Sequence, residues 1–363
     1  MLLSRLRAAA SSARWHVSLS SRGVLAVEGG DARKLLQGLV TADVSLLDAG
    51  PQYAGFLTSQ GKLLFDAFLL PGPSGSVLIE AEHGALPGLT AHLRRYKLRS
   101  KVKLRDVSEE IAVVACTGTE PIDDHSEASC EGAPWADPRL PSLLGYRMLR
   151  PRAAPLPACL QHSNDVDEGL YAMQLQLLGV PSGADLLSAE ALPLEANVEL
   201  LNGISFSKGC YLGQELTART HFRGVVRKRL LPVVDAARLH AAAELPDELP
   251  AFSHLPPAER RLAAALLCGT HAKPTPPPLT EAPSPPDAPA APEEDGSVDM
   301  SMSDPSGAKV GQLRSFEPEL GLGMALVRTE VLQSGTELVA SSAATGSCTR
   351  LMPLRPSWWS PPS

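Results

Sequence analysis

An eight-residue segment of the chain brings together a thiol, a cation and a carboxylate. Its sequence is KGCYLGQE, and its chemically notable members are Lys208, Gly209, Cys210, Tyr211, Gly213, Gln214 and Glu215. A nearby cation favours the thiolate, which is the form of cysteine that binds metals and attacks electrophiles. Glycine adopts backbone conformations that other residues resist, and it leaves room for a second backbone to approach. The segment therefore predicts an accessible thiol at Cys210, with Lys208 favouring its thiolate and the two glycines admitting a partner's backbone.

A metal cluster is the first role to weigh for Cys210. A self-contained iron–sulfur cluster needs about four ligands, mostly thiolates. The other cysteines of the chain are scattered and show no CxxC spacing: Cys116, Cys130, Cys159, Cys268 and Cys348. A cluster at Cys210 would therefore have to be shared with a second protein. His221, eleven positions further on, is another candidate ligand, and its alternative is a solvated histidine in a basic run.

Nucleophilic catalysis is a rival role for the same thiol. It requires a base within hydrogen-bonding reach, and the nearest acids in the sequence are Glu195 and Glu215. Either acid is equally compatible with a capped or solvated helix end. A third alternative is burial as a small apolar residue, which is the commonest fate of a free cysteine.

Other charged residues offer binding chemistry. Asp66 interrupts the apolar run 63–70, where a carboxylate is costly unless it is paired, faces a cavity or points outward. A basic run follows Cys210 and suits phosphate or carboxylate contacts, or alternatively a solvated face. Its members are Arg219, Arg223, Arg227, Lys228 and Arg229.

Composition excludes several classes of protein. The chain has 363 residues and a formal net charge of −7, with no acid before Glu28 but arginines at 5, 7, 14 and 22. Basic, serine-rich and acid-free N-termini are typical of organellar transit peptides, so we predict one over residues 1–23; the alternative is a disordered basic arm. No apolar run reaches the length of a membrane span. The acidic remainder argues against general nucleic-acid binding.

Strands and helices are mixed without the alternation of a doubly wound sheet, so the sequence predicts an α+β region over 24–224. The expected strands are 23–27, 53–58, 63–70, 76–81, 102–107, 111–116 and 144–150. The expected helices are 31–40, 85–98, 165–178 and 194–201.

A second, smaller β domain is expected over 225–345. Its strands are predicted at 225–234, 309–316, 321–328 and 336–340. Between them, residues 241–305 are rich in Pro, Ala, Ser and acids, which favours disorder with one helix at 258–267. Residues 346–363 are predicted to form a loose tail.

These segments together resemble the YgfZ-like branch of the folate-binding aminomethyltransferase superfamily. KGCYLGQE at 208–215 is the specific motif, supported by LPLEAN at 192–197 and ARTHFRGV at 218–225. LQGLVTAD at 36–43 and YAGFLTSQGK at 53–62 match the opening domain of that branch, and LGLGMALVR at 320–328 its closing barrel strand. The resemblance covers about residues 24–340 apart from the Pro-rich insert.

The resemblance implies a ring of α+β domains around a central, folate-sized cavity, followed by a small β-barrel. It implies an assembly factor in the mitochondrial matrix that matures four-iron proteins such as aconitase and lipoyl synthase. A-type cluster carriers would be its partners, and a shared cluster, with two irons, would be bound at Cys210.

The related glycine-cleavage T protein marks the runner-up function, folate-dependent aminomethyl transfer. Asp66 and Glu195 would belong to its tetrahydrofolate cavity. Leu175 and Leu177 stand near positions where the T protein has an Arg and a Glu. Their apolar character argues against transfer chemistry, which leaves a non-catalytic folate-binding scaffold as a further alternative.

Overall fold

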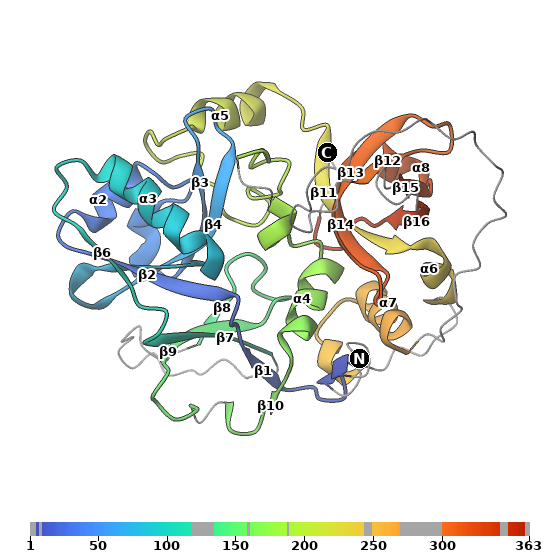
Figure 1. Ribbon diagram of the computed structural model, residues 1–363, viewed down its shortest axis with the longest axis horizontal. Coiled ribbons are helices and arrows are strands. Elements are labelled where there is room, and N and C mark those ends of the chain that lie inside the picture. Colours follow the sequence, from blue (N-terminus) through green and yellow to red (C-terminus); the bar gives the residue numbers. More distant parts are fainter. Residues whose placement is uncertain are drawn as a thin grey trace, which may run out of the picture.

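Two five-stranded sheets and a closed six-stranded barrel make up the framework of the protein (Figure 1). The computed structural model describes residues 5–6, 9–117, 134–157, 160–186, 189–242, 249–268, 300–341 and 348–359. Within these residues the predicted α+β fold with a separate C-terminal barrel is confirmed. None of the described helices has the length and apolar composition needed to cross a membrane.

The first sheet is antiparallel and supports the hairpin on which the cysteine segment lies. Its strand order is β3 (Gln52–Leu57), β4 (Leu63–Pro71), β5 (Val77–Glu82), β2 (Arg22–Glu28) and β6 (Lys103–Asp106). Helices α2 (Ala32–Gln37) and α3 (Leu86–Lys97) bury their leucines against one face of it. The other face turns toward the larger core of the protein, which includes Phe68 and Leu78.

The second sheet begins inside the predicted transit peptide. Its order is β10 (Asn164–Asp165), β1 (Trp15–Ser18), β7 (Ile111–Thr117), β9 (Tyr146–Pro151) and β8 (Trp135–Ala136). Trp15 is fully buried, and its indole nitrogen donates to the Ala251 carbonyl at 3.3 Å. The predicted boundary at residue 23 is therefore wrong as a structural boundary, because β1 pairs with β7 in the middle of the sheet.

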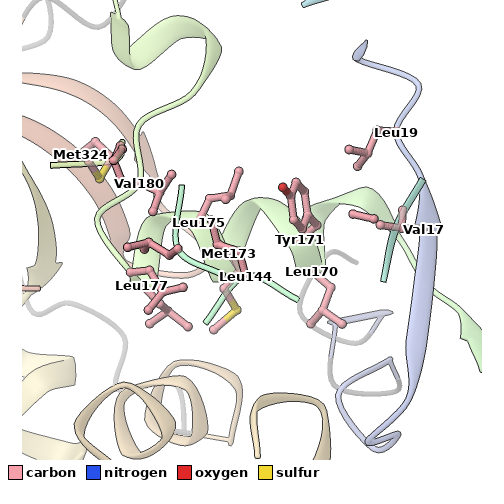
Figure 2. Packing of buried hydrophobic residues seen from close by; sticks show 14 of the residues in the cluster. Val17, Leu19, Leu144, Leu170, Tyr171, Met173, Leu175, Leu177, Val180 and Met324 are labelled. Atoms are coloured by element: carbon pink, nitrogen blue, oxygen red, sulfur yellow. The ribbon is translucent and has the colours of Figure 1, made fainter. Parts of the chain in front are cut away.

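Helix α4 (Glu168–Leu177) joins the two sheets to the barrel. The Asp167 side chain caps it by accepting from the Gly169 amide at 2.8 Å. Figure 2 shows Tyr171 and Leu175 on one side of this helix, with Leu170, Met173 and Leu177 on the other. The second group packs in the main core beside α7 (Pro257–Cys268), so α4 has two buried faces with different neighbours.

The barrel closes in the order β11 (Lys228–Asp235), β14 (Leu322–Arg328), β13 (Lys309–Glu317), β12 (Met300–Ser303), β15 (Leu338–Ser341) and β16 (Cys348–Pro353). Strand β16 pairs with both β15 and β11. The prediction of a loose tail over 346–363 is therefore wrong for residues 348–353, since without them the barrel would stay open.

The predicted disordered insert is also partly ordered. Helix α6 (Ala236–Ala242) precedes it, and α7 buries Leu262 and Leu266 one turn apart. Helix α7 confirms the helix predicted at 258–267. The 3-10 turn η6 (Pro250–Phe252) and the barrel strand β12 also lie within the insert, so the prediction of disorder is wrong for them. Residues 243–248 and 269–299 lie outside the described residues.

The remaining elements are short, apart from one helix. They are η1 (Val44–Asp48), η2 (Pro73–Gly75), η3 (His83–Ala85), η5 (Gly183–Leu186), α5 (Gln214–Arg223), η6 (Pro250–Phe252) and α8 (Val331–Ser334). The helix predicted over 194–201 is instead a series of turns, with Asn197 in the left-handed region at φ 61°.

Candidate functional site

The Cys210 side chain is exposed on a loop that leads into α5. The loop is tied to the segment between α2 and β3 at both of its ends. The Ser205 amide donates to the Thr41 carbonyl at 2.9 Å, and the Leu212 amide donates to the Gly38 carbonyl at 3.0 Å. The buried Thr41 hydroxyl adds a bond to the Gly203 carbonyl at 2.5 Å. The exposed thiol therefore sits on a loop whose backbone is held from inside.

Lys208 has a structural role that differs from the predicted one. Its ammonium donates to the carbonyls of Val40 at 2.9 Å and Ala42 at 2.7 Å. Burial lowers the pKa of Lys208 to about 8, while the nearby Asp43 carboxylate opposes that shift. The Lys208 ammonium thus anchors the loop, and neither of these contacts brings it to the Cys210 thiol.

The two glycines beside Cys210 are not equivalent. Gly213 has φ 78°, and a Cβ placed there would lie 2.2 Å from the Thr58 carbonyl oxygen. It therefore packs against the protein's own β3–β4 turn, and its predicted role in admitting a partner's backbone is wrong. A Cβ on Gly209 would meet nothing within 4 Å, so the space that a partner needs is open at that position.

The remaining motif residues shape the start of α5. The Gln214 side-chain oxygen accepts from the Tyr211 amide at 2.9 Å, and Tyr211 is largely buried, which raises its pKa to about 12. Glu215 lies in the first turn of α5, where a carboxylate interacts favourably with the helix dipole. Glu215 and Arg219 are both exposed.

No group of three or more potential metal-ligating side chains occurs among the described residues. Cys116 is buried in β7, and Cys348 is exposed in the barrel strand β16. His221 stacks face to face on Phe206, with ring centroids 3.6 Å apart. The stacking of this pair was not predicted. Its one signal in the sequence is Phe206, an aromatic residue close to the motif in a chain with only 4% aromatic residues.

A second candidate site is a cavity of about 270 Å³ between the first sheet, α4, η5 and the barrel. We call it the central cavity; its walls include Arg22, Glu82, Arg147, Tyr171, Leu175 and Asp185. Beneath it lies a buried charge network. Glu80 pairs with Arg147 and, at 2.9 Å, with Arg22. Arg139 chelates Asp137 at 3.0 and 2.7 Å.

The charges of this network are paired, although the buried Glu80 Oε2 and Arg147 Nε have no hydrogen-bond partner among the described residues. Burial disfavours ionisation of Asp137, but the adjacent Arg139 guanidinium outweighs it and holds the pKa of Asp137 below its usual range. The guanidiniums of Arg147 and Arg139 lie 4.5 and 4.9 Å from the centre of the Phe68 ring. Arg–aromatic contacts of this kind stabilise cations in water-poor sites. The arginines are therefore committed to the protein itself before any ligand arrives.

The two residues predicted for one folate-type cavity lie in different places. The Tyr53 hydroxyl donates to buried Asp66 at 3.4 Å, next to the charge network. Glu195 instead lines a separate cavity beside α5, where burial raises its pKa. Leu175 lines the central cavity as an apolar wall, and Leu177 is buried in the core.

The central cavity is small for tetrahydrofolate, the cofactor that the fold implies. Its volume of about 270 Å³ is below the roughly 300–1,000 Å³ of typical sites for drug-sized ligands. Because the acids predicted to bind folate are separated and the arginines are already paired, these residues do not fit the whole cofactor well.

Comparison with known proteins first defines the class. The glycine cleavage system aminomethyltransferase T of Bartonella henselae superposes over 98% of this chain and 89% of its own, with a TM-score of 0.63 at 13% identity. At that identity the likeness establishes the fold alone: the protein has an aminomethyltransferase-like fold. Residues 227–361 of this chain match the family model of the CAF17 C-terminal beta-barrel domain.

Sequence relatives define the family. They include proteins named as mitochondrial IBA57 homologues, iron–sulfur cluster assembly factors. The one from Dictyostelium discoideum is 35% identical over 68% of this chain and 69% of its own length. The one from Mycosarcoma maydis is 40% identical over 67% of this chain and 63% of its own. The chain belongs to the IBA57 family, and its match spans a little under two thirds of the Mycosarcoma relative.

Proposed function

We propose that this protein is an assembly factor of the mitochondrial matrix that matures four-iron iron–sulfur proteins. It works with A-type cluster carriers, holds a two-iron cluster jointly with the carrier at Cys210, and serves recipients such as aconitase and lipoyl synthase. The names of its relatives support the general role and the organelle. The specific partners and the shared cluster are the part that requires a test.

One observation carries the proposal: the exposed thiol of Cys210 stands on a firmly held loop, and no group of three potential ligands occurs among the described residues. A protein that offers one good ligand cannot satisfy a cluster that needs about four. The open space at Gly209 lets a second protein bring the others. The thiolate is the form of cysteine that binds metals.

The test is assembly of the cluster from purified components. The protein is mixed anaerobically with a reduced A-type carrier, iron and sulfide, and the visible absorption of the complex is recorded. We expect Cys210→Ser to lose the chromophore of the shared cluster, and Cys348→Ser, which removes the other exposed described cysteine, to keep it. Equal cluster formation by Cys210→Ser would contradict the ligand role.

Tetrahydrofolate binding is the second candidate, favoured by the shared fold and by the charged side chains Arg22, Glu82 and Asp185 on the walls of the central cavity, although that cavity is small for the whole cofactor. Calorimetry with tetrahydrofolate, followed by an assay with an aminomethyl donor, separates it from the first. Turnover would support a transferase; binding without turnover would support a folate-binding scaffold.

A further inference from the structure

A second cavity lies along α5, the helix that starts four residues after Cys210. Its volume is about 370 Å³, and its walls include Leu194, Glu195, Leu216, Thr217, Val225 and Lys228. We call it the α5 cavity. Most of its lining is apolar, and its volume is within the range of specific binding pockets.

The Thr217 hydroxyl in this cavity lacks a partner. Thr217 is only 2% exposed, and its Oγ1 has no hydrogen bond to any described residue. A threonine inside a helix commonly bonds to the carbonyl four residues earlier, which would have satisfied it. An unpaired buried hydroxyl destabilises the folded protein, so an incoming polar group would gain a prepared hydrogen-bond partner here.

Large apolar side chains extend from the α5 cavity toward the thiol loop. Four large hydrophobic side chains are exposed among the described residues, and two of them are Phe222 at 66% and Val225 at 78%. Val225 lines the cavity itself. Phe222 contacts Phe206 of the Cys210 loop, with ring centroids 5.9 Å apart. The cavity rim and the loop thus form one continuous surface, and exposed apolar patches of this kind mark interaction sites.

The same surface is basic in an otherwise acidic protein. Three of its exposed cations form no ion pair with a described residue: Arg219, Arg223 and Arg227. Lys228, also exposed, lies close enough to the Glu195 carboxylate for the two charges to interact. Arg229, the next residue, shows the contrast because it is bonded to Glu199 at 2.7 Å. Unpaired cations on a chain with net charge −7 are complementary to an acidic partner.

We infer that the α5 cavity is the docking site for the protein that shares a cluster at Cys210. The partner would insert one apolar side chain into the cavity, carry a polar group to Thr217 and present acidic residues to the surrounding cations. This inference rests on the proposed function for the existence of the partner, and adds where and how it binds.

The apolar anchor and the surrounding charges would contribute to binding in different ways. A buried apolar anchor supplies most of the affinity of an interface, whereas charges at its rim mainly raise the association rate and fix orientation. Docking along α5 would hold the partner's cluster ligands at a set position relative to the thiol. Binding should therefore survive loss of the thiol and weaken as salt is raised.

The experiment measures the affinity of the cluster-free A-type carrier by calorimetry. We expect Val225→Asp to weaken binding at least about tenfold, because it places a charge in the apolar cavity. The double reversal Arg227→Glu with Lys228→Glu should weaken it about tenfold and reduce its salt dependence. Lys309→Glu, an exposed reversal in the barrel strand β13, is the matched control and should bind normally. Thermal unfolding checks that each variant is folded.

The outcomes separate this inference from the proposed function. Cys210→Ser should bind the cluster-free carrier normally and fail only in cluster formation. Unchanged affinity of both α5-cavity variants would overturn the docking site while leaving the Cys210 role intact. No binding by the unchanged protein would overturn the partner itself, and the docking site with it.

Discussion

Gly213 and Gly209 look interchangeable in the sequence around Cys210, but their surroundings differ. Gly213 occupies the left-handed region, φ 78°, and its Cα faces the carbonyl of Thr58 in the β3–β4 turn. A side chain there meets backbone, which cannot give way as a flexible side chain does. The turn and the cysteine loop are consequently one packed unit.

We expect Gly213→Ala to destabilise the protein by more than the about 1 kcal/mol of left-handed strain alone, because it also pushes the loop off the hairpin. Urea unfolding measures the loss, and the rate at which Cys210 reacts with a thiol reagent measures the disturbance of the loop. Gly209→Ala is the matched variant: it has free space around it and should leave both values near those of the unchanged protein. Equal effects of the two variants would contradict the packing argument.

Lys208 shows the limit of sequence reasoning about single residues. A lysine two positions before a cysteine favours the thiolate only if its ammonium reaches the sulfur, and sequence distance does not reveal that. The structure directs it to two backbone carbonyls contributed by residues about 170 positions earlier. The thiol's exposure was predictable from its glycine-rich setting, whereas the anchors of its loop depend on non-local contacts.

Among the elements, strand β1 departs most from what the sequence predicts, because it lies within the predicted transit peptide. Trp15 and Val17 of β1 are buried next to β7 and the first turn of α4. In addition, the Ala10 carbonyl accepts a hydrogen bond from the Ala251 backbone amide at 3.1 Å. A basic, acid-free composition is typical of targeting sequences, but it does not stop the second half of the segment from pairing with a sheet.

Two truncations separate targeting from folding. A chain lacking residues 1–14 keeps β1 but loses the buried Leu6 and Ala10, so it should unfold at a moderately lower urea concentration, while losing mitochondrial import. A chain lacking residues 1–23 also loses β1 and the Trp15 indole, whose removal from a core typically costs about 3–5 kcal/mol. It should unfold at clearly lower urea. Equal stability of the two truncated chains would show that β1 contributes nothing, and retained import by either would contradict the targeting prediction.

Long, patterned elements were predictable and short or context-dependent ones were not. The β3–β4 hairpin, α3, α4 and β14 follow from alternating or helical apolar spacing within one segment. Strand β16 carries little such pattern and exists because the barrel supplies partners on both of its sides. Asp31 illustrates the same effect at a helix end: it occupies the N-cap position of α2, yet its carboxylate accepts from the Lys101 amide and does not cap the helix.

At the scale of the whole molecule, polar contacts join the two-sheet region to the barrel, and one of them lies at the wall of the central cavity. The Trp358 indole nitrogen donates to the Leu178 carbonyl at 2.6 Å, and the side-chain amide of Asn197 donates to the Leu230 carbonyl at 2.7 Å. Ser315 of β13 donates to Asp185 of η5. Asp185 is buried beside Asp66, so this last contact depends on a titrating group.

Burial raises the pKa of Asp185 from 3.8 to about 6, with the Asp66 carboxylate adding to the shift and the bonds from Ser315 and Ser182 opposing it. Between those two pH values the folded protein binds more protons at this site than the unfolded chain does. The free energy of unfolding therefore falls as pH rises through this window, and above it the cost of burying the carboxylate is fully present. An asparagine at position 185 would keep a side-chain oxygen that accepts from the Ser315 hydroxyl, but it would carry no charge.

We expect Asp185→Asn to match the unchanged protein in stability near pH 4 and to exceed it by about 1–3 kcal/mol near pH 8. Urea unfolding of both proteins across that range measures the difference, with all other titrating groups in common. Asp304→Asn serves as the control of opposite sign, because the hydroxyl of Ser306 and nearby amides hold the pKa of exposed Asp304 below its usual range. A stability difference for Asp185→Asn that does not change with pH would mean that this carboxylate is not the titrating contact between the two-sheet region and the barrel.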